Sequence, residues 1–309
     1  MVKSSKINVG ITIGDPNGIG IEIILKSLSN FSLFHECNFI IYASTSLIEK
    51  QKKHFQIDTP PLKKIDSEED LSDTQINVKE VFSNSQFNFG ESDKELSELG
   101  ILSLKEATKA IKDKKIDVLV TAPINKDLSF SESFKYTGHT DFLKNYFKTS
   151  PLMLMISEEL KIALLTDHIP IKDVSNAIDQ DFVEQKIKAL ETSLINDFQI
   201  KKPKIAVLAV NPHAGDNGVI GNEDQSIITP AINSFKGTTS SINGPFSADT
   251  FFVNENYKKY DGVIASYHDQ GLIPFKTYKF QDKMITNMHK NRFTIYKLPR
   301  QSGKSTTII

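Results

Sequence analysis

Three short apolar runs, each followed closely by a histidine, constrain the fold of this chain more than any other feature. Residues 161–166, 204–210 and 262–266 read as β-strands, and His168, His213 and His268 stand just past their ends. In open α/β sheets, ligands bind beyond the carboxyl ends of the strands, where several loops converge. Three imidazoles at one such edge could share a metal ion, although each histidine taken alone could merely cap its strand.

Predicted strands and helices alternate along the rest of the chain. Apolar periodicity predicts strands at 7–14, 38–43 and 116–120, and helices at 21–28, 98–114, 181–196 and 223–235. Such alternation implies an α/β fold with mainly parallel sheets and helices on both faces. These units exceed what one sheet comfortably carries, so we expect two lobes, residues 1–135 with 270–309 and residues 136–269. The site would lie in the cleft between them.

Charge and hydropathy narrow the class of partner. The net charge of -1 argues against a general binder of nucleic acid or anionic membrane, because such proteins carry a basic excess. Small molecules are therefore the expected ligands. No run reaches the roughly 18 apolar residues of a membrane span, and the first residues lack a cleavable signal pattern, so we expect a cytoplasmic protein. The single cysteine, Cys37, is expected in the core.

The spacing of the three histidines bears on the kind of metal site. Gaps of 45 residues (213 minus 168) and 55 residues (268 minus 213) are too long for a zinc finger and suit a catalytic site assembled by the fold. Asp269, beside His268, could accept a hydrogen bond from that imidazole and fix its tautomer. Asp249, in a further polar loop, could be a helix cap, a ligand or a base.

Polar loops nearer the amino terminus suggest an anion site. The glycine-rich turn 14–20 joins a strand to a helix and could approach a phosphate closely. It lacks the spacing of a dinucleotide fingerprint, and its glycines could serve a purely steric purpose. Lys126, His139 and Thr140 are stronger candidates for holding an anionic substrate, while a solvated surface role stays open for Lys126.

Seven of these loops form a recognisable ordered set. They are GDPNGIG (14–20), TAPINK (121–126), GHTD (138–141), DHIP (167–170), NPHAG (211–215), ADT (248–250) and YHDQG (267–271). In this order they resemble the 4-hydroxythreonine-4-phosphate dehydrogenase family of the vitamin B6 pathway, over residues 7 to about 280. The resemblance implies a two-lobed α/β/α fold like that of isocitrate and isopropylmalate dehydrogenases. It also implies a homodimer with active sites at the subunit interface.

The resemblance further implies the reaction and the roles of the site residues. The activity would be NAD-dependent oxidation of 4-phosphooxy-L-threonine, with decarboxylation to 3-amino-2-oxopropyl phosphate. His168, His213 and His268 would bind a divalent metal, and His139, Thr140 and Lys276 the substrate. Asp249 and Lys126 are the predicted catalytic residues. Three nitrogen ligands favour zinc or another transition dication over magnesium, which prefers oxygen.

Two other functions are compatible with these residues. A paralogue acting on a phosphorylated four-carbon sugar acid, such as erythronate or threonate phosphate, would use the same metal, hydride and phosphate chemistry. A protein that binds metal and phosphosugar without turnover is the third possibility, and it is prompted by the carboxyl-terminal segment. No residue is assigned to the nicotinamide cofactor.

The segment 281–309 departs from the family pattern. It holds the only arginines, Arg292 and Arg300, and its six basic residues against one acidic residue give it a charge of +5. A changed reading frame, a truncated gene or true divergence could each produce such a segment. Its SGKST stretch (302–306) resembles half of a P-loop, but Leu298 stands where the first glycine belongs, so the match is read as accidental.

Overall fold

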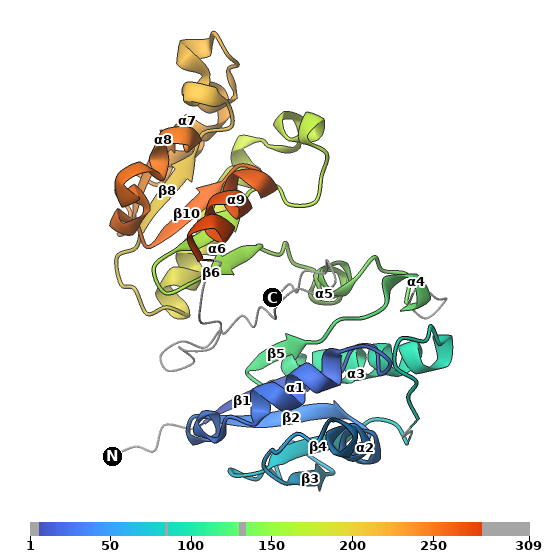
Figure 1. Ribbon diagram of the computed structural model, residues 1–309. Coiled ribbons are helices and arrows are strands. Elements are labelled where there is room, and N and C mark those ends of the chain that lie inside the picture. Colours follow the sequence, from blue (N-terminus) through green and yellow to red (C-terminus); the bar gives the residue numbers. More distant parts are fainter. Residues whose placement is uncertain (1–5, 84–85, 130–133, 280–309) are drawn as a thin grey trace, which may run out of the picture. The chain divides into compact units, whose positions relative to one another are not determined.

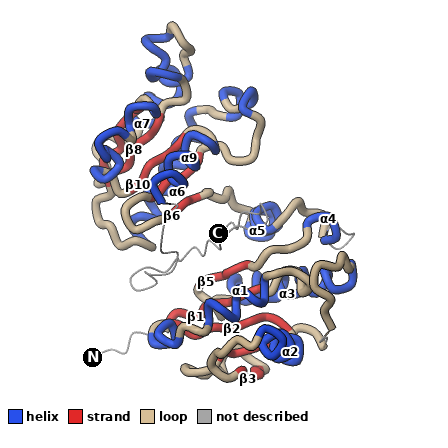
Figure 2. Tube along the Cα trace, in the orientation of Figure 1, coloured by secondary structure: helices blue, strands red, loops and turns tan. Residues whose placement is uncertain are grey.

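A computed structural model describes residues 6–83, 86–129 and 134–279 of the chain. The described residues divide into two compact units, one running to Pro151 and the other starting at Leu152. Figure 2 shows how helices and strands alternate along each of them. The features predicted within 281–309 lie outside the described residues. Each unit is described below by itself.

The first unit is built on a five-stranded parallel sheet in the order β3-β4-β2-β1-β5 (Figure 1). Its strands are β1 (Ile7–Thr12), β2 (Cys37–Ala43), β3 (Leu62–Ile65), β4 (Ile76–Glu80) and β5 (Val118–Thr121). Its helices are α1 (Gly20–Leu28), α2 (Thr45–Phe55), α3 (Lys94–Lys112), α4 (Lys126–Ser129) and α5 (His139–Phe147), with a 3-10 turn at Phe31–His35. Ile40 and Tyr42 of β2 pack against Leu104 of α3 in one core cluster.

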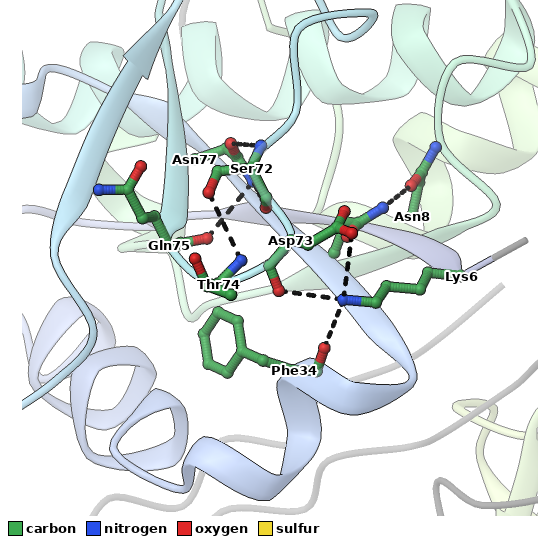
Figure 3. Close-up of polar contacts among 9 residues, drawn as sticks. Lys6, Asn8, Phe34, Ser72, Asp73, Thr74, Gln75 and Asn77 are labelled. Carbon is green, nitrogen blue, oxygen red and sulfur yellow. Dashed lines mark hydrogen bonds and ion pairs between the residues drawn. The ribbon is translucent and has the colours of Figure 1, made fainter.

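The loop between β3 and β4 is fastened by two side chains (Figure 3). The amide of Asn77 accepts a hydrogen bond from the Ser72 backbone N–H at 2.8 Å. The Lys6 ammonium donates to the carbonyl oxygens of Phe34, at 2.7 Å, and Asp73, at 3.0 Å. These contacts hold the edge of the sheet. Strands β3 and β4 were not predicted, because the sequence over 57–95 shows no firm periodicity.

The second unit has the strand order β6-β7-β10-β8-β9. Its strands are β6 (Leu154–Ile156), β7 (Lys161–Leu164), β8 (Lys204–Leu208), β9 (Ser241–Phe246) and β10 (Gly262–Ala265). Only β6 runs antiparallel to its neighbour. Its helices are α6 (Gln180–Asn196), α7 (Thr229–Asn233), α8 (Ala248–Phe251) and α9 (His268–Lys279), with a π-helical turn at Asp224–Ile228. Short 3-10 segments lie at Ile171–Asp173, Ser175–Ala177, Pro212–Gly218 and Val253–Lys259.

Side-chain alternation along the strands of this sheet separates two cores. Ile205 and Val207 of β8 join the cluster that contains Leu190 of α6. Ala206 and Leu208 of the same strand join the cluster that contains Leu272 and Phe275 of α9. Successive residues of a strand point to opposite faces, so α6 and α9 cover opposite faces of the sheet. The predicted α/β/α layering with mainly parallel strands is therefore confirmed.

The unit boundaries differ from those drawn at 135/136 and 269/270. Helix α5 belongs to the first unit because its Phe142 and Leu143 are buried with Phe134 in that core. Helix α9 packs on β7 and β10 of the second unit. No helix within the described ranges is long and apolar enough to cross a membrane.

Candidate functional site

Four neighbouring parallel strands of the second unit end at the same edge of the sheet, and each is followed by a predicted site residue. In the order β7, β10, β8 and β9 these residues are His168, His268, His213 and Asp249. Parallel strands present their carboxyl ends on one side, so the topology brings these side chains to a common edge. The sequence placed the histidines after strands, and the strand order puts the ends of those strands side by side.

His168 and His268 form the closest pair at this edge. Their ring centroids lie 5.6 Å apart. Imidazole nitrogens bind zinc at about 2.0 to 2.1 Å, so two rings that share an ion in a tetrahedral site have centroids roughly 5 to 6 Å apart. The pair therefore has a spacing and a donor chemistry that suit one divalent transition metal.

Asp269 holds the ring of His268 through the Nδ1 atom of the imidazole. Its carboxylate oxygen Oδ1 lies 2.7 Å from the His268 Nδ1 atom. A carboxylate in this position accepts a hydrogen bond from the Nδ1–H group and leaves Nε2 available as a metal ligand. The contact anticipated for Asp269 is thus present in the structure.

His213 lies in the turn Pro212–Gly218, where the backbone φ angle is positive from His213 (53°) to Asn217 (54°). His213 also acts on Asp249, whose pKa is lowered mainly by a hydrogen bond from the Ser247 hydroxyl and to a smaller extent by His213. Over the described part of the chain, no three His, Cys, Asp or Glu side chains are close enough together to hold a metal ion. The single site shared by three histidines stays a prediction.

In the first unit, Lys126 and His139 lie close to each other. The Lys126 Nζ atom is 3.9 Å from the position that a Cβ atom on Gly138 would occupy, and Gly138 caps the helix that begins at His139. The His139 Nε2 atom is fully buried, with no hydrogen-bond partner among the described residues. Burial, and to a smaller extent the charge of Lys126, lowers the pKa of His139 to about 4.

A cation, a neutral imidazole and a helix amino terminus together suit a bound anion. The first backbone N–H groups of a helix carry partial positive charge and lack partners within the helix. Thr140, half-buried, is the second residue of α5 and contributes one of these groups. Lys276 lies elsewhere, half-buried on α9. It is eight residues from His268, about 12 Å along the helix axis.

The glycine-rich turn 14–20 is explained by packing. Gly14 has a φ angle of 66°, and a Cβ atom there would lie 2.1 Å from the carbonyl oxygen of Pro123. A Cβ atom on Gly20 would lie 2.6 Å from the carbonyl oxygen of Ile13. Both glycines are required sterically, so their presence is accounted for without a bound phosphate.

Two residues at the strand edge of the second unit were missed by reasoning from the sequence. The carboxylate of Asp224 is fully buried and accepts hydrogen bonds from the backbone of Val210 and Asn211. Gln270 bridges the ends of β10 and β8. Gln270 stands within the YHDQG motif and could have been singled out there, whereas nothing in the sequence around Asp224 marks it.

Comparison with known protein families identifies one match over most of the chain. Residues 35–289 match the family model described as pyridoxal phosphate biosynthetic protein PdxA. A 4-hydroxythreonine-4-phosphate dehydrogenase from Sulfurihydrogenibium sp. (strain YO3AOP1) is 38% identical over 276 residues. That alignment covers 89% of this chain and 84% of the relative.

Two further proteins bear on substrate and fold. A relative from Oceanobacillus iheyensis, described provisionally as a D-threonate 4-phosphate dehydrogenase, is 33% identical over 88% of this chain and 83% of its own length. The crystal structure of a 4-hydroxythreonine-4-phosphate dehydrogenase from Burkholderia phymatum superposes with a TM-score of 0.80 at 27% identity. It covers 90% of this chain and 86% of that structure.

Proposed function

The chain belongs to the family of pyridoxal phosphate biosynthetic protein PdxA, and we propose that it oxidises 4-phosphooxy-L-threonine with NAD and a divalent metal. The product after loss of carbon dioxide would be 3-amino-2-oxopropyl phosphate. The observation that carries the proposal is the strand order β7-β10-β8-β9, which gathers His168, His268, His213 and Asp249 at one sheet edge.

The metal-binding part of the proposal rests on the second unit. His168 and His268, with centroids 5.6 Å apart, would be joined by His213 as ligands. A bound dication would polarise the substrate hydroxyl and stabilise the negative charge left by decarboxylation, while NAD would accept the hydride. The nitrogen donors favour zinc or another transition dication, with magnesium a poorer match.

The chain's own residues would orient the substrate and move its proton. Asp249 stays ionised because the Ser247 hydroxyl donates to it at 2.6 Å and lowers its pKa. An exposed carboxylate at this edge can accept the proton of the hydroxyl that is oxidised. Lys126, assigned to catalysis, would pair with developing or fixed negative charge on the substrate.

Substrate binding is assigned to His139, Thr140 and Lys276. At neutral pH the lowered pKa keeps His139 uncharged, so it would bind through a hydrogen bond, and the cationic partner would be Lys126. The backbone N–H groups at the start of α5 would add to the anion site. The proposal also includes the homodimer with shared sites that the family resemblance implies, which light scattering would test. It includes the cytoplasmic location expected from the sequence, which cell fractionation would test.

A second substrate is favoured by one specific observation. The relative from Oceanobacillus iheyensis carries the description of a threonate phosphate dehydrogenase and is 33% identical to this chain. Such a substrate has a hydroxyl where phosphooxy-threonine has an amino group. The metal, hydride and phosphate chemistry would be the same, so only contacts to that one substituent would differ.

The test measures NADH formation by the metal-loaded protein with 4-phosphooxy-L-threonine, D-threonate 4-phosphate and D-erythronate 4-phosphate. We expect the first to give the highest kcat/KM. His168→Ala should abolish the reaction and the bound metal, whereas the exposed His35→Ala should retain both. Higher kcat/KM with a sugar-acid phosphate would assign the second substrate. Binding of metal and phosphorylated ligand with no NADH from any of the three would establish a non-catalytic homologue.

A further inference from the structure

Side chains continue the pairing of β10 and β8 beyond the point where the strands themselves stop. The backbone ladder between these strands ends at the pair Ile264 and Val207. Past it, the Gln270 Oε1 atom accepts from the Ser266 backbone N–H, and its Nε2 atom donates to the Ala209 carbonyl oxygen, each at 2.7 Å. One carboxamide thus joins the two segments that lead to His268 and His213.

Ser266 extends the same connection to both neighbouring strands. Its hydroxyl donates to the Leu208 carbonyl oxygen at 3.1 Å, and its own carbonyl oxygen accepts from the Thr166 hydroxyl at 2.8 Å. Ser266 and Thr166 are both buried. The ends of β7, β10 and β8 are therefore connected by polar groups that are shielded from water, where hydrogen bonds are strong and costly to lose.

Asp224 fixes the next two residues on the way to His213. Its Oδ1 atom accepts from the Val210 backbone N–H at 2.7 Å, and its Oδ2 atom accepts from the Asn211 backbone N–H at 3.0 Å. The Oδ2 atom also accepts from the Asn211 side chain at 3.1 Å. Asp224 is fully buried, and its own carbonyl oxygen accepts a hydrogen bond from the Thr229 hydroxyl at 2.8 Å.

These contacts bear on the geometry of the candidate metal site. Ser266 and Gln270 stand two residues before and two residues after His268, and Asn211 stands two residues before His213. Side chains that set the position of the backbone so close to a ligand also set where its imidazole can reach. Outer partners of this kind tune metal affinity without touching the metal.

We propose that Gln270 and Asp224 are positioning residues of the metal site: Gln270 sets the spacing between the segments that carry His268 and His213, and Asp224 fixes the segment that leads to His213. The inference rests on the proposed function, since it presupposes that these histidines bind a metal. Gln270 acts across the two strands, and Asp224 acts on the β8 segment alone. Both should therefore affect metal affinity and coordination geometry more than overall folding.

The test compares Zn²⁺ affinity, by chelator competition, in the full-length parent protein and in Gln270→Met, with Gln180→Met as the matched control. Gln180 is exposed on α6, and among the described residues its side chain bonds to Glu184 alone, at 2.8 Å. We expect Zn²⁺ affinity to fall by about 10- to 100-fold in Gln270→Met and to stay at the parent value in Gln180→Met. Asp224→Asn, which removes one acceptor for Asn211, should weaken binding in the same range.

The visible spectrum of the Co²⁺-substituted proteins reports the coordination of the bound ion, which a general loss of stability would not change. The parent should show the intense bands of four-coordinate Co²⁺, and Gln270→Met the weaker bands of a more open, higher-coordinate ion. If Gln270→Met fails to fold by circular dichroism, Gln270→Glu decides by its Co²⁺ spectrum. It keeps the acceptor for Ser266 and replaces the donor to Ala209 with a charged carboxylate oxygen.

The outcomes separate this inference from the proposed function. Parent protein that binds neither Zn²⁺ nor Co²⁺ would overturn the metal site and the inference together. If the folded Gln270 and Asp224 variants bind Zn²⁺ as tightly as the parent does and show the same Co²⁺ spectrum, the inference alone is overturned. Weakened binding with an altered spectrum in these variants, and not in Gln180→Met, would support it.

Discussion

The imidazole of His139, whose Nε2 atom is fully buried, should make this protein less stable as the pH falls below neutrality. In the folded chain its pKa is lowered from 6.5 to about 4, first by burial and then by Lys126. The unfolded chain therefore takes up a proton at a higher pH than the folded chain does. The sign follows from linkage: the free energy of unfolding falls as the pH drops from about 6.5, and the loss is complete near pH 4.

The lowered pKa sets the size of this effect. The largest loss of unfolding free energy that His139 can cause is about 3 kcal/mol, because each unit of the pKa difference between the unfolded and folded chains is worth about 1.4 kcal/mol. Between about pH 7 and pH 5, integration of the linkage relation gives a loss of about 2 kcal/mol from His139. A loss of this size is a large fraction of the stability of an ordinary domain.

The assay is urea unfolding at about pH 7 and pH 5 of the parent protein, His139→Gln and His35→Gln. Glutamine keeps a neutral polar side chain and cannot titrate, so His139→Gln should lose about 2 kcal/mol less than the parent between the two pH values. His35 is exposed, and its substitution should leave the parent's pH dependence in place. Comparing pH differences cancels the contribution of the other acidic groups.

A direct measurement completes the argument. Nuclear magnetic resonance of labelled imidazole should show His139 titrating near pH 4 in the folded protein. If His139 instead titrates near 6.5, or if His139→Gln and the parent lose the same free energy between pH 7 and pH 5, the buried neutral imidazole is the wrong description of this site.

Three shorter predictions concern other parts of the chain. Gly14→Ala should lower the free energy of unfolding by about 2 to 4 kcal/mol, because the new Cβ atom would meet Pro123 at a positive φ angle. The control Gly90→Ala has a φ of 79° and open space around it, so it should lower the free energy of unfolding by only about 1 kcal/mol. Equal losses in urea unfolding would contradict this. Asp269→Asn should weaken Zn²⁺ binding about tenfold in chelator competition, and an unchanged affinity would argue against its role. Replacing 281–309 with a family-type tail should raise kcat/KM for the phosphorylated substrate, and equal efficiency would show that the native segment suffices.

The sequence by itself determined the fold class and the local position of most site residues. Apolar runs bounded by polar loops located six strands, among them β7, β8 and β10, because a buried parallel strand needs a continuous apolar run. The same pattern placed His168, His213 and His268 just after these strands. The strands that were missed, such as β3 (LKKI) and β9 (SINGPF), have polar residues, glycine or proline where a typical strand is apolar.

Only the tertiary structure decided which of these strand ends are neighbours. β10 is the last strand in sequence but lies between β7 and β8, so His268 stands next to His168 and Asp249 follows the outer strand β9. Strand order depends on the packing of residues far apart in the chain, and the local pattern carries no record of it. For the same reason, the bridging role of Gln270 and the burial of Asp224 and of the His139 Nε2 atom became visible only in the folded chain.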